Sequence, residues 1–438
     1  MKSMLLKIST HDFVKLLSDR PYAYFLLSVV FSQVAFNMMN VVLIFVVFNL
    51  TSSNFLVSMI LLISLIPQVF LSFIGGIVAD TRNKKKILVF GNLGRAFFVL
   101  PLFYFNDSLA PVYTLALLIS IVTQFYLPAE TPVIPHIVPE KLLVPANSLF
   151  GLALFGSILI GYVVAGPALL SLGHAYVFLV IAVFFLLAGL FAYLIPYSAF
   201  QSGKKVRKRI TVEVEETLRS YLVNTYKILH ETAGVASSFV LLILSQVVIM
   251  ILAVIVPGYA KEILKIQVEN VSLLLFAPAA LGMIVSAFIV GSVLKKANRA
   301  KLMNTGVFVS GIILLLLPLM SKVTSRDFIT TLNLALPSYL EITVLHMVVF
   351  LAFFAGVGNA LIFIPAQTTI QEKIPDNFRS KIYGLLFAVT GLFSFLPIVL
   401  VGGLADTLGV NLVLIILGTV IIVGEVIQLL AVKYIKRR

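Results

Sequence analysis

Twelve apolar runs, each long enough to cross a lipid bilayer, follow one another along this chain. A helix that spans the hydrocarbon core needs about 20 apolar residues. With 60% hydrophobic and 11% charged residues, the composition also departs from that of soluble domains, of which roughly 25% is charged. The sequence therefore predicts an all-α integral membrane protein with spans at 21–49, 54–79, 86–106, 110–136, 143–171, 174–197, 235–259, 270–294, 300–320, 340–370, 380–404 and 409–432.

The basic residues test this number of spans. Of the 32 lysines and arginines, 28 fall at the two ends of the chain or in and near the even-numbered loops. Only Lys261, Lys265, Lys322 and Arg326 fall in the odd-numbered loops. Basic loops stay on the cytoplasmic side of a membrane. We therefore expect both termini in the cytoplasm, and we interpret the net charge of +14 as a topology signal rather than as a nucleic-acid-binding surface.

A basic linker divides the runs into six and six. Residues 198–234 begin with a cluster of lysines and arginines and continue with apolar residues at helical spacing, which is typical of an amphipathic surface helix. The predicted organisation is a cytoplasmic N-terminal segment at 1–20, expected to form a short helix, a six-helix bundle at 21–197, the linker at 198–234, and a second bundle at 235–438.

The two halves repeat weakly. The segment Tyr126–Thr131, with sequence YLPAET, is similar to Phe363–Thr368, with sequence FIPAQT. Gln367 therefore holds the place of Glu130, and a loop with an apolar residue and a proline follows both segments. The repeat predicts two pseudo-symmetric bundles, an arrangement found in transporters whose halves move against each other.

A short polar stretch follows the second apolar run. Gly75 and Gly76 are expected to let a neighbouring helix approach closely. Asp80 lies at a helix C-terminus, where the macrodipole disfavours an anion, so we expect it to have a cationic partner or a helix N-terminus nearby. The basic residues that follow are Arg82, Lys84, Lys85 and Lys86.

This stretch resembles the loop between helices two and three of the major facilitator superfamily. Gly76, Asp80, Arg82 and the triplet Lys84 to Lys86 match the motif at the same spacing. Thr81 and Asn83 depart from it, standing where a basic residue and a glycine are usual. The resemblance implies a cytoplasmic gate, and we predict that Asp80 pairs with the start of the eleventh span near Arg379.

The resemblance extends over nearly all of the chain and narrows to one branch. Pro128-Ala129, Pro135, Val138-Pro139-Glu140 and Pro365 to Gln371 follow the pattern of the branch that holds macrolide-efflux proteins of the drug–proton antiporter type. Siderophore exporters and lysophospholipid transporters show related patterns. The glycines and proline of the fifth span resemble an antiporter motif with looser spacing, and we expect them to serve in helix packing: Gly156, Gly161, Gly166 and Pro167.

Glu130 is the strongest candidate for chemistry. Pro128, Pro132 and Pro135 surround it, and a backbone broken by prolines survives at membrane depth only against protein or a wet cavity. Desolvation favours the neutral form of a carboxyl, so this residue is a candidate carrier of a coupling proton. The alternatives are a structural latch formed with Arg95 or another base, and an acid that faces lipid.

Further polar residues in the spans are candidates for lining a cavity, because polar groups inside a membrane are costly and tend to be functional. Arg95 either attracts an anionic substrate, pairs with an acid or extends to the membrane surface. The candidates are Gln33, Asn37, Asn40, Arg95, Gln246, His346 and Gln367. For most of them, hydrogen bonding between helices is the competing interpretation.

The sequence predicts a secondary transporter rather than an enzyme. It contains no nucleophile–base motif, metal-ligand cluster or phosphate-binding loop, and no cysteine. We expect no cofactor, no metal and no nucleic-acid partner. The interpretation is a monomeric exporter in a bacterial inner membrane that moves an amphipathic small molecule by alternating access and proton antiport. The alternatives are a lysophospholipid or siderophore transporter and, less favoured, a membrane-embedded lipid enzyme.

Overall fold

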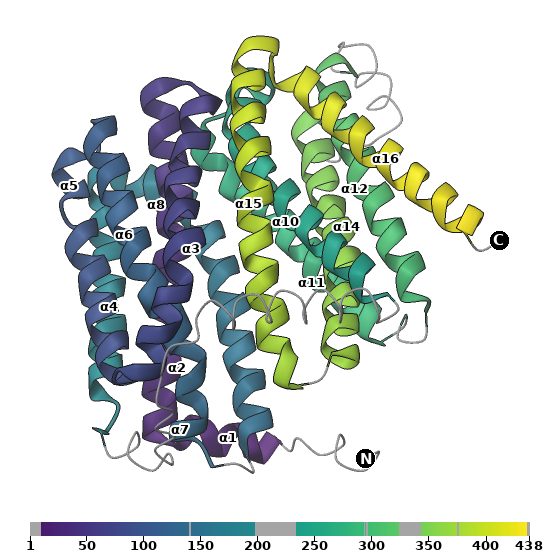
Figure 1. The fold of residues 1–438 in the computed structure, drawn as a ribbon. Helices are drawn as coiled ribbons and strands as arrows, with labels where there is room; N and C mark the ends of the chain where they lie inside the picture. Colours follow the sequence, from purple (N-terminus) through teal and green to yellow (C-terminus); the bar gives the residue numbers. More distant parts are fainter. Residues whose placement is uncertain are drawn as a thin grey trace, which may run out of the picture. The chain divides into compact units, whose positions relative to one another are not determined.

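The computed structural model describes residues 10–139, 142–197, 234–323 without 293, 295 and 296, 343–374, and 376–435. Every element in these ranges is a helix, as predicted (Figure 1). Eleven helices among the described residues are long and apolar enough to cross a membrane. One of them, α8 (Leu143–Leu194), holds two of the predicted spans, because its backbone leaves helical geometry at Gly173. The described helices thus accommodate the twelve predicted spans.

The chain divides into two compact units, 1–50 with 60–210 and 51–59 with 211–438. Within the first unit, α4 packs against α6 and α8. The elements of the first half of the sequence are α1 (Thr10–Ser18), α2 (Arg20–Thr51), α3 (Asn54–Thr81), α4 (Lys84–Val99), α5 (Leu102–Phe105), α6 (Leu109–Glu130), η1 (Thr131–Val133), α7 (Ile134–Ile137) and α8. The predicted short helix before the first span is α1, whereas the predicted linker helix lies outside the described residues.

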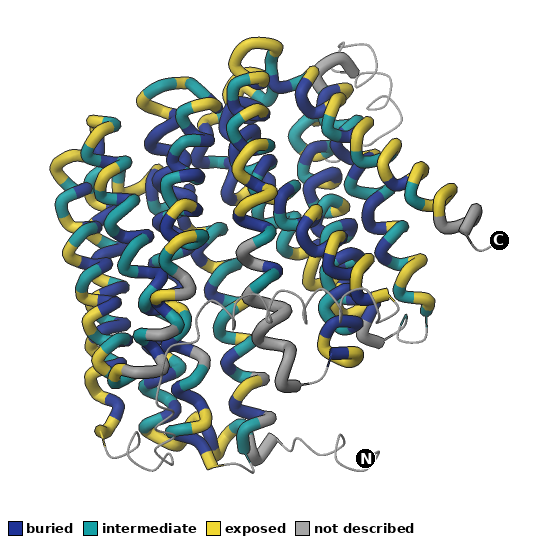
Figure 2. The backbone as a smooth tube through the Cα atoms, in the orientation of Figure 1, coloured by how far each residue is buried: buried dark blue, intermediate teal, exposed yellow. Residues whose placement is uncertain are grey.

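In the second unit, α14 packs against α10, α11 and α12, and α15 packs against α10 and α16. Exposed apolar positions recur on successive turns of α16 (Figure 2), which suits a lipid-facing surface. The elements are α10 (Val235–Gly258), η4 (Tyr259–Leu264), η5 (Val268–Asn270), η6 (Ser272–Phe276), α11 (Ala277–Ser292), α12 (Arg299–Val323), α14 (Val344–Lys373), α15 (Asp376–Leu408) and α16 (Val410–Ile435).

Left-handed backbone recurs at corresponding connections of the two halves. Gly173 (φ 78°) separates the two spans of α8, and Gly409 (φ 83°), 236 residues later, separates α15 from α16. Ser52 (φ 51°) follows α2, and Lys265 (φ 54°) follows η4 at the end of the seventh span. Non-glycine residues rarely adopt this conformation. The repeat inferred from the YLPAET and FIPAQT segments therefore extends to the turns.

Several predicted spans are interrupted. The third span is α4 followed by α5, with the break at Pro101. The fourth ends as an α-helix at Glu130 and continues through the 3₁₀ turn η1 into α7, where the prediction had one helix to residue 136. The seventh ends in the π-helix η4, and the eighth begins with η5 and η6. The prolines near Glu130 account for the interruption of the fourth span.

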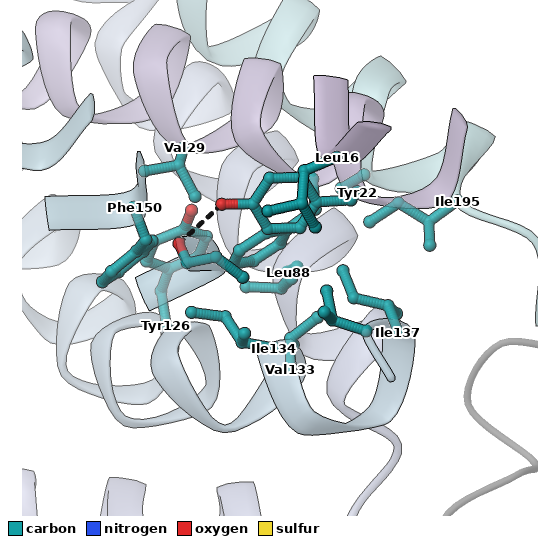
Figure 3. Close-up of a cluster of buried hydrophobic side chains, with 14 residues drawn as sticks. Leu16, Tyr22, Val29, Leu88, Tyr126, Val133, Ile134, Ile137, Phe150 and Ile195 are labelled. Atoms are coloured by element: carbon teal, nitrogen blue, oxygen red, sulfur yellow. Dashed lines mark hydrogen bonds between the residues drawn. The ribbon is translucent and has the colours of Figure 1, made fainter. Parts of the chain in front are cut away.

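The core of the first unit is a cluster of fourteen buried apolar side chains (Figure 3). It includes Leu16 from α1, Val29 from α2, Leu88 from α4 and Tyr126 from α6. Tyr22 lies in the cluster with its hydroxyl satisfied, because it donates a 2.7 Å hydrogen bond to the carbonyl oxygen of Ala146. The cluster holds α6 and α7 in place on either side of Glu130.

Candidate functional site

Glu130 is the last residue of α6 and is only 3% exposed. Pro128 lies inside the helix two residues earlier, and η1 begins at the next residue. A proline provides no backbone donor, so Pro132 and Pro135 leave carbonyls of the preceding turn without helical partners. The prolines therefore end α6 at Glu130, the residue that carries the buried carboxylate.

Two neutral side chains bind the Glu130 carboxylate. The Tyr126 hydroxyl donates to Oε1 at 2.9 Å, and Gln33 Nε2 donates to Oε2 at 3.1 Å. Tyr126 is one helical turn before Glu130 on α6, a spacing that brings side chains onto one face. Gln33 comes from α2. Each carboxylate oxygen therefore has a donor, and neither donor carries a charge.

Arg95 of α4 is 1% exposed and is held by three oxygens that do not belong to Glu130. Its Nε donates to the carbonyl of Gly91 at 3.3 Å. Its NH2 group donates to Ser32 Oγ at 3.0 Å and to Asn92 Oδ1 at 2.6 Å. The guanidinium is thus fully inside the first unit, and the direct Arg95–Glu130 pairing considered from the sequence is absent.

Aromatic rings complete the surroundings of Arg95. The guanidinium carbon lies 3.8 Å from the ring centre of Tyr126 and 4.7 Å from that of Phe185. Such cation–π contacts contribute about 2 kcal/mol or more when desolvated. Tyr126 lies among the apolar side chains of the cluster in Figure 3. Its ring therefore contacts the cation while its hydroxyl binds the anion.

We name Ser32, Gln33, Asn92, Arg95, Tyr126 and Glu130 the α2–α4–α6 polar cluster. Sequence reasoning identified Gln33, Arg95 and Glu130 but missed the other three. The signals were present: Asn92 and Tyr126 precede the charged residues by three and four positions on their helices, and side chains at these spacings are neighbours. Ser32 directly precedes Gln33 and offers no comparable signal.

The other α2 candidates lie apart from the carboxylate. Asn37 is buried, and its Nδ2 donates to the carbonyl of Gln33 at 2.7 Å. A Cβ placed at Gly161 of α8 would lie 2.8 Å from the Asn37 Cβ, so Asn37 marks a close approach of α2 and α8. Asn40 is half-buried. The predicted packing role thus fits Gly161, whereas a Cβ at Gly156 would meet open space.

The candidates from the second half lie in the second unit. Gln246 of α10 and Gln367 of α14 are half-buried. His346 is exposed at the start of α14 and forms a capping box with Thr343, with its Nδ1 2.7 Å from Thr343 Oγ1. His346 therefore has a local role at a helix N-terminus.

The stretch after α3 begins α4. Asn83, which stands where the family motif has a glycine, caps α4 by accepting a 3.2 Å bond from the Lys86 N–H. Lys85 Nζ lies 5.3 Å from the centre of the Tyr193 ring. Gly75 faces the backbone of Gln124, whereas Gly76 faces open space. The side chains of Asp80 and Arg379, the proposed gate pair, lie outside the described residues.

Among the described residues, no three His, Asp or Glu side chains gather as a metal site would require. The chemistry that the α2–α4–α6 polar cluster offers is reversible protonation of one carboxyl group beside one fixed cation.

Comparisons with known proteins show the family to which the chain belongs. The model of the Major Facilitator Superfamily matches residues 25–338. The chain is 23% identical over 401 residues to the uncharacterized MFS-type transporter YfiS of Bacillus subtilis (strain 168), covering 91% of this chain and 89% of the relative. It is 25% identical over 385 residues to a second uncharacterized MFS-type transporter of that organism, YvqJ, with 85% and 82% covered.

Solved structures share the fold at low identity. A POT family transporter in complex with a thioalcohol-conjugated peptide has a TM-score of 0.70 at 14% identity, with 94% of this chain and 96% of that chain covered. The nucleoside transporter NupG has a TM-score of 0.67 at 13% identity, with 92% and 97% covered. With its apolar helices, its repeated halves and this family match, the chain is a multi-pass membrane transporter and belongs to the Major Facilitator Superfamily.

Proposed function

We propose that this transporter exports an amphipathic small molecule in exchange for protons, and that Glu130 carries the coupling proton. One observation supports the proposal above others. The Glu130 carboxylate is buried in a membrane-spanning segment, and its two hydrogen-bond donors are neutral. An acid at membrane depth is costly to keep, so a role that uses its ionisation is favoured.

The two donors suit both protonation states. A tyrosine hydroxyl donates or accepts, and the glutamine amide has an acceptor oxygen beside its donor nitrogen. Tyr126 and Gln33 can therefore donate to a carboxylate, and one of them can accept from a carboxylic acid after rotating. A cationic donor could not accept. The site can load and release a proton without leaving a buried polar group unsatisfied.

Arg95 supplies a charge that stays constant through this cycle, because a guanidinium is not deprotonated in proteins. It is anchored by Ser32, Asn92 and the Gly91 carbonyl, so it stays in place whether Glu130 is charged or neutral. With Glu130 ionised, the α2–α4–α6 polar cluster has no net charge. When Glu130 is protonated, the cluster carries one positive charge. An uncompensated buried charge is costly, so this state favours a change of conformation that lets water reach the cluster.

The substrate class is the second element of the proposal. The resemblance to the macrolide-efflux branch favours an amphipathic drug-like substrate, and lysophospholipid or siderophore transport is the alternative. Solved structures with this fold include a POT family transporter in complex with a thioalcohol-conjugated peptide and a nucleoside transporter, so the fold itself admits many substrates. The proposed setting is a monomer in a bacterial inner membrane with both termini in the cytoplasm, closed on that side by Asp80 and Arg379.

Glu130→Gln tests the coupling role. Glutamine fits the motif, since Gln367 occupies the corresponding place in the FIPAQT segment. We expect the variant to exchange substrate down its gradient in proteoliposomes and to lose accumulation driven by a pH difference. A panel of drugs, siderophores and lysophospholipids supplies the substrates. Glu425→Gln is the matched control, because Glu425 is also 3% exposed but lies in α16 of the second unit.

Three outcomes separate the interpretations. Loss of pH-driven accumulation with normal exchange and melting temperature supports proton coupling. A lower melting temperature with both activities lost together indicates a structural latch. Unchanged pH-driven transport in Glu130→Gln contradicts the proposed coupling residue.

A further inference from the structure

The short helix α1 directly precedes the first span of the first unit. Only Asp19 separates Ser18, the last residue of α1, from Arg20, the first residue of α2. The Asp19 carboxylate accepts from the N–H of Tyr22 at 3.4 Å and so satisfies a free donor at the start of α2. Figure 1 shows α1 lying across the end of the first unit instead of continuing along α2. The chain therefore turns a corner at Asp19.

The apolar residues of α1 share one side of the helix. Successive residues of an α-helix are about 100° apart around its axis. The four apolar residues therefore occupy an arc of about 160°, in the order Leu16, Phe13, Leu17 and Val14. Lys15 lies opposite the middle of this arc. We name these four residues the α1 apolar side.

The protein covers one edge of the α1 apolar side. Leu16 is 1% exposed and lies in the buried cluster with Tyr22 (Figure 3). Phe13 is half-buried, whereas Leu17 is 51% exposed and Val14 is 60% exposed. Exposure thus rises in the same order in which the residues follow one another around the helix. None of the described residues covers the edge formed by Leu17 and Val14.

The length of α2 places α1 at the membrane surface. Arg20–Thr51 is apolar and long enough to cross a membrane. Its 32 residues extend over about 48 Å, at about 1.5 Å for each residue. The hydrocarbon core of a bilayer is about 30 Å thick, and the headgroups increase this to about 40–45 Å. The start of α2 therefore lies among the lipid headgroups, and α1 lies at the same level.

The remaining features of α1 suit this level. A helix of nine residues is not stable in water without packing of an apolar face, and Leu16 supplies that packing on one edge alone. Lys15 and Arg20 are both exposed. Basic side chains near the ends of membrane helices extend to the headgroups. An apolar edge beside the acyl chains and a basic residue on the opposite side are the features of an interfacial helix.

We propose that α1 is an interfacial anchor, in which membrane lipid covers Leu17 and Val14 while Leu16 fastens the helix to the buried cluster. The partner is the surface of the bilayer that α2 crosses. The anchor joins this surface to the cluster that holds α6 and α7 on either side of Glu130. The inference goes beyond the proposed function, because it involves neither a transported substrate nor a coupling proton.

Tryptophan fluorescence tests the anchor, because the chain contains no tryptophan. Leu17→Trp introduces a single tryptophan on the exposed edge, in the full chain reconstituted into vesicles of phosphatidylethanolamine and phosphatidylglycerol. One quencher is a lipid with a nitroxide just below the headgroup, and the other is acrylamide in the water. Lys15→Trp is the matched control, because it places the tryptophan on the same helix, opposite the α1 apolar side.

We expect the nitroxide lipid to quench Leu17→Trp about threefold more strongly than Lys15→Trp, and acrylamide to show the reverse preference, because one side of an interfacial helix faces the acyl chains. Val14→Trp should behave like Leu17→Trp. This second variant keeps the test valid if Leu17→Trp melts abnormally.

Two results would overturn the proposal. Equal acrylamide quenching of the tryptophans on the two sides of α1 would place the exposed edge in water. Weak quenching of Leu17→Trp and Val14→Trp by both agents would show that protein, such as a second copy of the chain, covers this edge. Neither measurement uses substrate or a pH gradient, so failure of the anchor is distinct from failure of the Glu130 proposal.

Discussion

The guanidinium of Arg95 lies over the ring of Tyr126, 3.8 Å from its centre, and the hydroxyl of the same tyrosine donates to Glu130. Cation and anion are thus connected through one aromatic side chain instead of meeting directly. A direct ion pair would fix the carboxylate in its charged form. The intervening tyrosine keeps the cation close enough to interact, while it leaves the carboxylate with donors that can also accept.

The first prediction concerns Arg95. Replacing it with lysine should lower the stability of the first unit by about 3 kcal/mol, because the ammonium cannot reproduce the forked hydrogen bonds or the stacking on two rings. The measurement is the melting temperature in detergent. Lys85→Arg, at a position where the side chain already lies over Tyr193, is a control and should melt like the unmodified protein. If Arg95→Lys melts at the same temperature as the unmodified protein, the forked hydrogen bonds of the guanidinium contribute little to stability.

The second prediction separates the two functions of Tyr126. Tyr126→Phe keeps the ring beneath Arg95 and removes the hydroxyl, so Glu130 keeps one donor of two. We expect a loss of about 1 kcal/mol in stability together with weakened pH-driven transport. Tyr126→Leu also removes the cation–π contact and should melt clearly lower than Tyr126→Phe. If Tyr126→Phe transports normally under a pH gradient, the hydroxyl has no part in coupling.

Much of the fold follows from the sequence because the membrane imposes simple rules. Apolar length predicts each span, and the YLPAET and FIPAQT segments predict the repeat. Where helices break was predicted less well. The proline-rich segment around Glu130 was expected to disturb the backbone, but the exact end of α6 at Glu130 depends on the packing of the cluster around Tyr126. Pro257 lies two residues before the π-helix η4, but the sequence analysis predicted no break in the seventh span.

The site shows the same limit. Glu130, Arg95 and Gln33 stand out as polar residues in apolar runs, and the structure brings them into one cluster. How they are connected depends only in part on tertiary contacts. The four-residue spacing of Tyr126 and Glu130 on one helix indicates their contact from the sequence alone. The position of Arg95, which comes from α4, over the Tyr126 ring is a tertiary contact that no local pattern indicates.

The third prediction concerns topology. Reporter fusions after Leu172 and after Glu215 should report opposite sides of the membrane, because only one span separates these positions. Glu215 should lie on the cytoplasmic side, because it belongs to the basic linker. A fusion after Arg438 should report the same side as Glu215. Identical signals at Leu172 and Glu215 would contradict the assignment of two spans to α8.

The last prediction uses two neighbouring glycines that the sequence could not distinguish. Both Gly75 and Gly76 were expected to allow close helix approach. A Cβ at Gly75 would overlap the backbone carbonyl oxygen of Gln124 on α6, whereas a Cβ at Gly76 would meet nothing within 4 Å. Gly75→Ala must therefore push α3 away from α6, close to the polar cluster. Overpacking of this kind costs about 1–3 kcal/mol.

We expect Gly75→Ala to melt lower and to transport poorly, and Gly76→Ala to melt at or slightly above the temperature of the unmodified protein, because alanine favours a helix over glycine. Melting temperature and substrate exchange on the same preparations measure both effects. Gly76 belongs to the family motif and Gly75 does not. If Gly76→Ala folds normally but fails to transport, its importance lies in the movement of α3 rather than in its packing. If Gly75→Ala melts normally, the close approach of α3 to α6 is wrong.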